Sequence, residues 1–119
     1  MRKSSALMLV TFSLLCGCQA ATPQEARMKN AVVSEHSSRS VDQVSRCIYQ
    51  GWSTTQVVER DSTTHIEHEE NRLTVFTWED SMFADVYKQG SGTAVRFYKT
   101  FNMGPEVLAD RSRIVKRCT

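Results

Sequence analysis

The placement of the four cysteines limits how this 119-residue chain can fold more than any other feature. Cys16 and Cys18 lie close together near the N-terminus, whereas Cys47 and Cys118 are 71 positions apart (118 − 47). A bond between the latter two would close a loop that includes most of the remaining chain. The chain-entropy argument gives such a loop about 4 kcal/mol of stability. The chain is long enough for one small domain, and a small domain gains from such a bond.

The N-terminus has the pattern of a secretory signal. Arg2 and Lys3 precede an apolar run over residues 6–15. As a helix this run would span about 15 Å, roughly half the hydrocarbon core of a bilayer. It is therefore too short for a transmembrane anchor and is typical of a signal peptide.

The four residues from Leu15 to Cys18 resemble the lipobox of bacterial lipoproteins. The resemblance implies that residues 1–17 are removed as a signal peptide and that Cys18 carries the lipid, with acyl chains such as palmitate. Cys16 departs from the small residues usual at its position, but it is similar to them in size. Related lipoproteins that stay in the inner membrane have Asp where this chain has Gln19. We therefore expect a lipid anchor in the outer membrane, with the protein facing the periplasm.

Two other interpretations of the N-terminus stay open. Secretory cleavage after Ala20 or Ala21 would give a soluble periplasmic protein, and an uncleaved chain would be cytosolic with an apolar N-terminus. Export would place the domain in an oxidising compartment, where disulfides form. Cys16 would be removed with the signal and Cys18 would be lipidated, so Cys47 and Cys118 are the one pair left to bond. The sequence therefore predicts a Cys47–Cys118 disulfide, with two unbonded buried thiols as the alternative.

The charge balance argues against a nucleic-acid partner. The chain has 15 basic and 13 acidic residues, a formal net charge of +2. Two of the basic residues, Arg2 and Lys3, belong to the signal, so the exported part has 13 of each sign and a net charge of zero. Nucleic-acid binding is expected from a basic surface, which this composition does not indicate.

A helix is expected to begin after Ser40. Ser40 and Gln43 form a capping-box pattern, and Gly51 is a natural stop. Trp52 should pack beneath the end of this helix. The apolar positions recur at helical spacing and include a cysteine: Val41, Val44, Cys47 and Ile48.

A second helix is expected from Pro105 to the C-terminus, because Pro is favoured at the first helical position. Basic side chains near its end suit the helix dipole. Its apolar stripe leads to the last cysteine: Val107, Leu108, Ile114, Val115 and Cys118. Both cysteines thus lie on the core faces of the two terminal helices, which supports the predicted bridge.

The middle of the chain has the composition of β-strands joined by short turns. Connections of two to five residues predict antiparallel pairing. The last strand should place Val95, Phe97 and Phe101 on one face. The expected strands cover residues 56–59 with 63–67, 72–78, 82–88 and 93–101.

The predicted fold class is α+β. It has an N-terminal helix, a three- to four-stranded antiparallel sheet and a C-terminal helix, with the helices linked by the Cys47–Cys118 disulfide. Residues 39–119 form the domain. The polar residues 18–38 are expected to be a flexible tether, with an end-to-end distance on the order of 25 Å.

Residues 39–119 resemble small uncharacterised bacterial lipoproteins. The shared features are a helix with Cys47-Ile48 followed by Trp52, a Gly-Ser turn over residues 90–92, and Tyr98 in the last strand. A terminal helix that ends in Cys118 completes the resemblance, which implies no activity.

No pattern in the sequence indicates catalysis or metal binding. His65 and His68 lie three residues apart in a predicted strand and should face opposite sides, so a shared metal ion is disfavoured. Glu79 and Asp80 have the composition of a turn, although adjacent carboxylates could form an acid–base pair. The sequence around Gly90 lacks the Lys and helix of a phosphate-binding loop, so a turn is expected there.

Two clusters could contact a partner. The basic residues of the last helix suit a solvated face, or contact with anionic lipid: Arg111, Arg113, Lys116 and Arg117. Three aromatic residues suit the core or, if exposed, a binding patch: Trp78, Phe83 and Tyr87.

We therefore expect a non-enzymatic envelope lipoprotein, a protein-binding or structural module without a cofactor. The alternative is a periplasmic immunity or inhibitor protein against a toxin or wall hydrolase.

Overall fold

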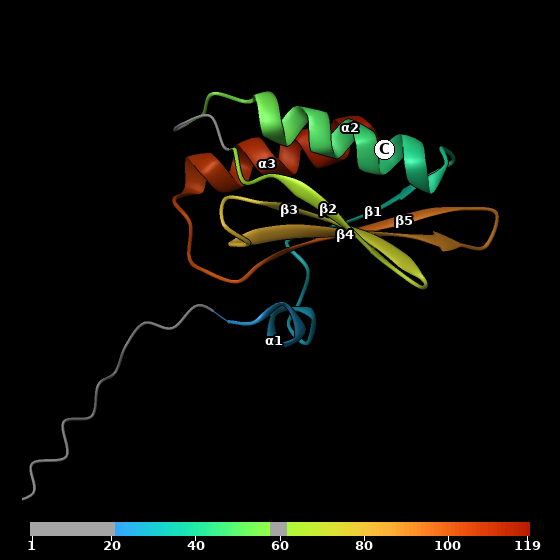
Figure 1. Cartoon of the computed structure of the whole chain (residues 1–119), viewed down its shortest axis with the longest axis horizontal. Coiled ribbons are helices and arrows are strands. Elements are labelled where there is room, and N and C mark those ends of the chain that lie inside the picture. Colours follow the sequence, from blue (N-terminus) through green and yellow to red (C-terminus); the bar gives the residue numbers. More distant parts are fainter. Residues whose placement is uncertain (1–20, 58–61) are drawn as a thin grey trace, which may run out of the picture.

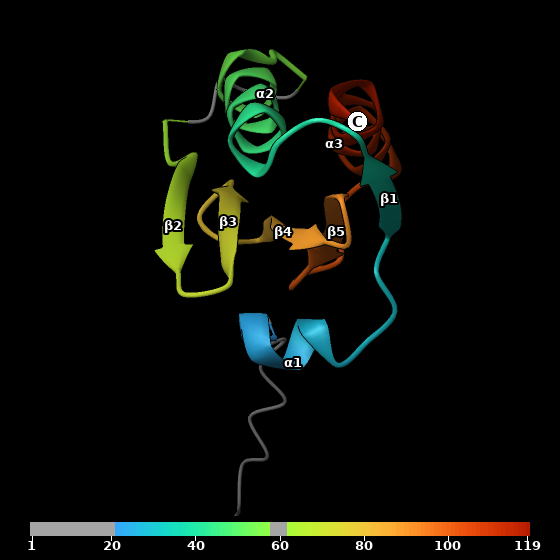
Figure 2. The same cartoon turned by 90° about the vertical axis from the view of Figure 1, so that its right-hand side faces the viewer.

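A five-stranded antiparallel sheet separates two helices on one face from a short helix on the other (Figure 1, Figure 2). The computed structural model describes residues 21–57 and 62–119. The sheet order is β1-β5-β4-β3-β2. The helices are α1 (Pro23–Arg27), α2 (Val41–Thr54) and α3 (Pro105–Cys118), and the strands are β1 (Val33–Ser37), β2 (His65–Glu69), β3 (Arg72–Thr77), β4 (Met82–Gln89) and β5 (Gly92–Lys99).

The predicted α+β class is confirmed, but the predicted number of strands is too low, since the sheet has five. The additional strand is β1, which pairs antiparallel with β5 from Val33↔Phe97 to Ser37↔Thr93. It lies in the segment that the sequence predicts as a tether, and α1 precedes it there. From residue 21 onward this segment therefore belongs to the fold, and the expectation of a flexible tether over residues 18–38 is corrected for that part. The expectation failed because the strand is short and polar, with only its two ends buried.

Helix α2 begins as predicted and ends later than predicted. The Gln43 backbone N–H donates to the Ser40 hydroxyl and the Ser40 N–H donates to the Gln43 side chain, both at 3.1 Å, which is the predicted capping box. Gly51 does not stop the helix, which continues to Thr54. A Cβ at Gly51 would lie 2.5 Å from the Ile114 side chain. Glycine is thus needed for the close approach of α2 to α3.

The main core lies between the sheet and the layer formed by α2 and α3. Trp52 is fully buried, its ring centroid is 5.4 Å from that of Phe97, and its indole N–H donates to the Arg111 carbonyl at 3.2 Å. Side chains in β4 alternate between the two faces of the sheet. Those that face α2 and α3 are Met82, Ala84 and Val86, and those on the other face are Phe83, Asp85 and Tyr87.

The predicted turns between β2 and β3, β3 and β4, and β4 and β5 are present, with two differences at strand ends. The strand expected over residues 56–59 is absent at residues 56–57, and residues 58–59 lie outside the described part of the chain. Residues Trp78, Glu79 and Asp80 form a left-handed turn with φ of 51°, 50° and 62°, so β3 ends before Trp78. Gly90 has a φ of 60° in the turn between β4 and β5, where glycine avoids the steric cost of that conformation. Phe101 lies beyond β5 and is 49% exposed, so it does not join Phe97 in the core as expected.

The Cys47–Cys118 disulfide joins α2 to α3, with the two Cα atoms 5.6 Å apart. Cys118 is fully buried, and the bond closes the 71-residue loop that the sequence predicts. Because both helices pack on the same face of the sheet, the bond holds the two helices of this layer together, from the middle of α2 to the end of α3.

Loss of this disulfide should destabilise the fold. We expect Cys47→Ala with Cys118→Ala to lower the free energy of unfolding in urea by about 2 to 5 kcal/mol. Intact mass should show no alkylatable thiol at either position in the native, unreduced protein. Two reactive thiols in that sample would contradict the assignment.

Candidate functional site

A buried carboxylate marks the face of the sheet opposite α2 and α3. Asp85 on β4 is 5% exposed. The Arg27 guanidinium on α1 donates two hydrogen bonds to it, at 2.8 and 2.9 Å, and the Thr74 hydroxyl donates a third at 2.8 Å. A buried carboxylate is stable when its oxygens accept such hydrogen bonds. The hydrogen bond with Asp85 is the largest influence on the pKa of Arg27, which is raised although burial opposes the shift.

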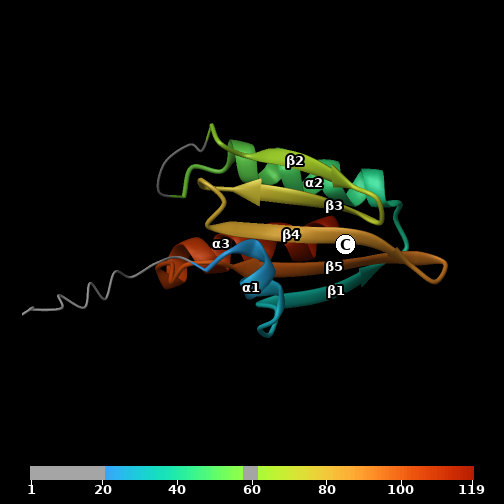
Figure 3. The same ribbon diagram turned by 60° about the horizontal axis from the view of Figure 1, so that its bottom comes forward.

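This ion pair fixes α1 over one part of the sheet. Arg27 also lies over the Phe83 ring, 4.8 Å from its centroid. A second, smaller core forms beneath the helix from Ala26, Phe76, Phe83 and Tyr98. Because α1 has only five residues, about 7.5 Å of helix, it leaves the rest of this face uncovered (Figure 3).

A cavity of about 450 Å³ lies on this face beside the turn between β2 and β3. Its polar groups come from three strands and one turn. The Arg72 Nη2 donates to Glu69 across 2.7 Å, and the Arg72 Nε lies 3.9 Å from Asp85. The residues that line it are Glu69, Glu70, Asn71, Arg72, Asp85 and Tyr87.

The cavity is suited to recognition of a polar partner group. The Nε of Arg72 is buried and makes no hydrogen bond in the described part of the chain, whereas its Nη2 pairs with Glu69 at the rim of the cavity. The carboxylates of Glu69 and Asp85 are each held by a guanidinium group.

The two histidines of β2 lie where the sequence analysis expects them. Within residues 21–57 and 62–119, no three metal-ligating side chains come together. The His65 ring stacks on Phe76 with centroids 5.1 Å apart, and its Nδ1 donates to the Thr63 carbonyl at 2.8 Å. That hydrogen bond is the main cause of a raised His65 pKa, burial opposes it, and the carboxylates of Glu67 and Asp80 add to it.

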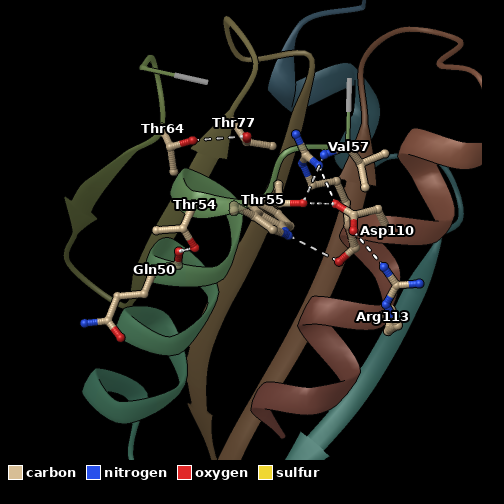
Figure 4. A network of polar contacts seen from close by, with 10 residues as sticks. Gln50, Thr54, Thr55, Val57, Thr64, Thr77, Asp110 and Arg113 are labelled. Carbon is tan, nitrogen blue, oxygen red and sulfur yellow. Dashed lines mark hydrogen bonds and ion pairs between the residues drawn. The ribbon is translucent and has the colours of Figure 1, made fainter. Parts of the chain in front are cut away.

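The expected basic face of α3 is divided between the core and the surface. Figure 4 shows Asp110 and Arg113 of this helix beside Thr55, at the end of α2. Arg111 is fully buried, so the expectation that it is solvated is wrong. Its Nη1 donates to Asp110 at 2.6 Å, and its guanidinium lies over the Trp78 ring at 5.9 Å. The Thr55 hydroxyl donates to the same carboxylate at 2.9 Å, which ties the end of α2 to α3. Arg113, although 70% exposed, donates to it at 2.8 Å.

The remaining sequence-predicted residues do not form a site in the described residues. Phe83 is buried, whereas Trp78 and Tyr87 are partly exposed and face different surroundings, so the three aromatics form no common patch. Glu79 and Asp80 lie in the turn described above, as expected. The predicted lipidation site, Cys18, lies outside the described residues.

Sequence reasoning missed the residues that build the cavity. Asp85 is the only carboxylate in the otherwise apolar stretch of β4 from Met82 to Val86, and that pattern was the available signal. Its partner Arg27 lies 58 positions earlier, in a segment expected to be a tether.

Comparison with protein-family models, curated proteins and solved structures gives no match to this chain. Among the described residues, no helix is both long and apolar enough to cross a membrane.

The raised pKa of His65 predicts a pH-dependent contribution to stability. When the pKa in the folded state lies above the unfolded value of about 6.5, the protonated imidazole stabilises the fold. This stabilisation is fully present below the unfolded pKa and is lost as the pH rises through the folded-state pKa. We therefore expect His65→Ala to cost more stability near pH 5 than near pH 8, measured by urea unfolding. His68 is exposed on the same strand, so His68→Ala should stay within about 0.5 kcal/mol at both pH values. Equal costs of His65→Ala at the two pH values would refute this role.

Proposed function

We propose that this protein is a lipid-anchored, non-enzymatic module of the cell envelope that binds a protein partner through the cavity beside Tyr87. The observation that carries the proposal is the cavity itself, which α1 leaves uncovered on a rigid sheet. Binding sites built on strands are held more precisely than sites on loops.

The proposed anchor is lipid on Cys18, in the outer membrane and facing the periplasm. The lipobox-like residues from Leu15 to Cys18 and the short apolar run before them support it. The Cys47–Cys118 disulfide supports export, because such bonds persist in oxidising compartments such as the periplasm. Gln19 supports the outer membrane, because lipoproteins with the lipobox-like pattern that stay in the inner membrane have Asp at this position.

The charge of the cavity indicates the kind of partner. Three carboxylates line the cavity, those of Glu69, Glu70 and Asp85, together with one guanidinium group, that of Arg72, and Arg27 binds Asp85 from α1. The excess of negative charge favours a partner surface that presents a basic side chain. Such complementarity contributes to specificity and to the rate of association.

Lipidation is tested by substitution at the acceptor. We expect Cys18→Ala to abolish metabolic labelling with palmitate and to release the protein from the outer-membrane fraction, because the thiol that carries the lipid is gone. Cys16→Ala is the matched control and should keep both properties, since Ala is usual at that position of a lipobox. Labelling that survives Cys18→Ala would rule out the proposed anchor.

Partner binding is tested by a photo-crosslinking amino acid placed at Tyr87 in living cells. We expect one discrete adduct, identified by mass spectrometry, and we expect Glu70→Lys to remove it because the charge at the cavity is reversed. Glu106→Lys reverses an exposed charge on α3 and should leave the adduct intact. The same crosslinker at Gln50, exposed on α2, should not give it. The proposal fails if both positions give the same adducts, or if Glu70→Lys has no effect. A toxin or wall hydrolase as the partner would assign the inhibitor function.

A further inference from the structure

The chain enters the fold at one particular end of the sheet. The Ala21 backbone N–H donates to the Thr100 carbonyl at 2.8 Å, just beyond the end of β5. The turn between β3 and β4 lies at this same end, because the Thr100 N–H donates to the Ser81 carbonyl at 2.8 Å. We call this the Thr100 end, which is on the left in Figure 1. The opposite end, the hairpin end, has the β2–β3 and β4–β5 turns.

The distance from the anchor to the fold is short. Only residues 19 and 20 separate the proposed lipidation site, Cys18, from Ala21. Three Cα–Cα steps of a fully extended chain span at most about 11 Å. A lipid on Cys18 therefore holds the Thr100 end close to the membrane surface, and this step rests on the anchor proposed above.

The Thr100 end presents an exposed aromatic side chain. Phe101 follows directly on the residue that binds Ala21, and it is 49% exposed. Large apolar side chains with such exposure are few among the described residues: Met28, Tyr49 and Phe101. Of these, Phe101 is next to the point where the chain enters. Aromatic side chains are favoured at the interface between lipid and water.

The charges around Phe101 do not select an anionic surface. Lys99 and Glu79 are both exposed at this end, as is Glu106 in the first turn of α3. Because both signs are present, electrostatic attraction to anionic headgroups is weak. Contact with lipid at this end depends on the apolar side chain, and a zwitterionic bilayer is sufficient for it.

We infer that the Thr100 end rests on the bilayer that carries the anchor, with Phe101 inserted at the lipid–water interface. The cavity then points away from the membrane. Met82 pairs with Lys99 at the Thr100 end, and Tyr87 follows five residues later along β4. Five residues of antiparallel strand span about 17 Å, so Tyr87 is held above the headgroups and is accessible to a periplasmic partner.

The test measures contact of single positions with lipid. The full chain is expressed in a bacterial host and purified from envelopes, and intact mass shows whether lipid is attached. The protein is then reconstituted in vesicles of phosphatidylethanolamine and phosphatidylcholine with brominated acyl chains, which quench tryptophan fluorescence on contact. The variants are Phe101→Trp and, as the matched control, Ser91→Trp. Ser91 is exposed in the β4–β5 turn at the hairpin end. The wild-type protein gives the signal of Trp52 and Trp78.

We expect the tryptophan in Phe101→Trp to be quenched several-fold more than that in Ser91→Trp, after subtraction of the wild-type signal. Equal quenching of the two variants in lipidated protein would overturn the orientation and leave the anchor intact. Protein without lipid would overturn the anchor and the orientation together, and intact mass separates these two outcomes.

Discussion

The close contact between α2 and α3 is the constraint on which the rest of the structure depends. Gly51 lets the two helices approach, since any side chain there would clash with Ile114. The Cys47–Cys118 disulfide fixes the same pair of helices covalently. With both helices held at this spacing, one layer covers the inner face of the sheet and Trp52 is buried completely. A domain of this size buries only a modest core, so this cross-link is a large part of its stability.

The opposite face of the sheet is organised by one ion pair. Arg27 binds the buried Asp85 and fixes α1 over Phe83. The helix covers part of the face and leaves the cavity beside Tyr87. The hydrogen bond from Ala21 to Thr100 and the pairing of β1 with β5 also make the N-terminal segment part of the domain, which shortens the distance between the fold and the proposed lipid on Cys18. The proposed binding site and the proposed orientation on the membrane therefore both depend on how this segment packs on the sheet.

The network at the ends of α2 and α3 shows how a polar group can be accommodated in the core. Asp110 accepts hydrogen bonds from Thr55, Arg111 and Arg113. Arg111 is fully buried and also lies over Trp78. Removal of one partner would leave a buried charge without compensation, which typically costs more than the pair contributes. These side chains are therefore best understood as support for the helical layer, whereas the residues around Tyr87 are those available to a partner.

The sequence by itself determined the features that depend on neighbours along the chain. Local periodicity predicts the two main helices and the strands from β3 to β5, and the capping box at Ser40 predicts where α2 begins. The disulfide could be predicted because helical spacing places each of its cysteines on the apolar face of its own helix. The tertiary structure decided what depends on distant partners. The polar strand β1 is stable because β5 pairs with it, Gly51 continues a helix because α3 is close, and Asp85 is buried because Arg27 reaches it from 58 positions away. Such contacts leave no periodic signal, since their free energy comes from groups that only the folded chain brings together.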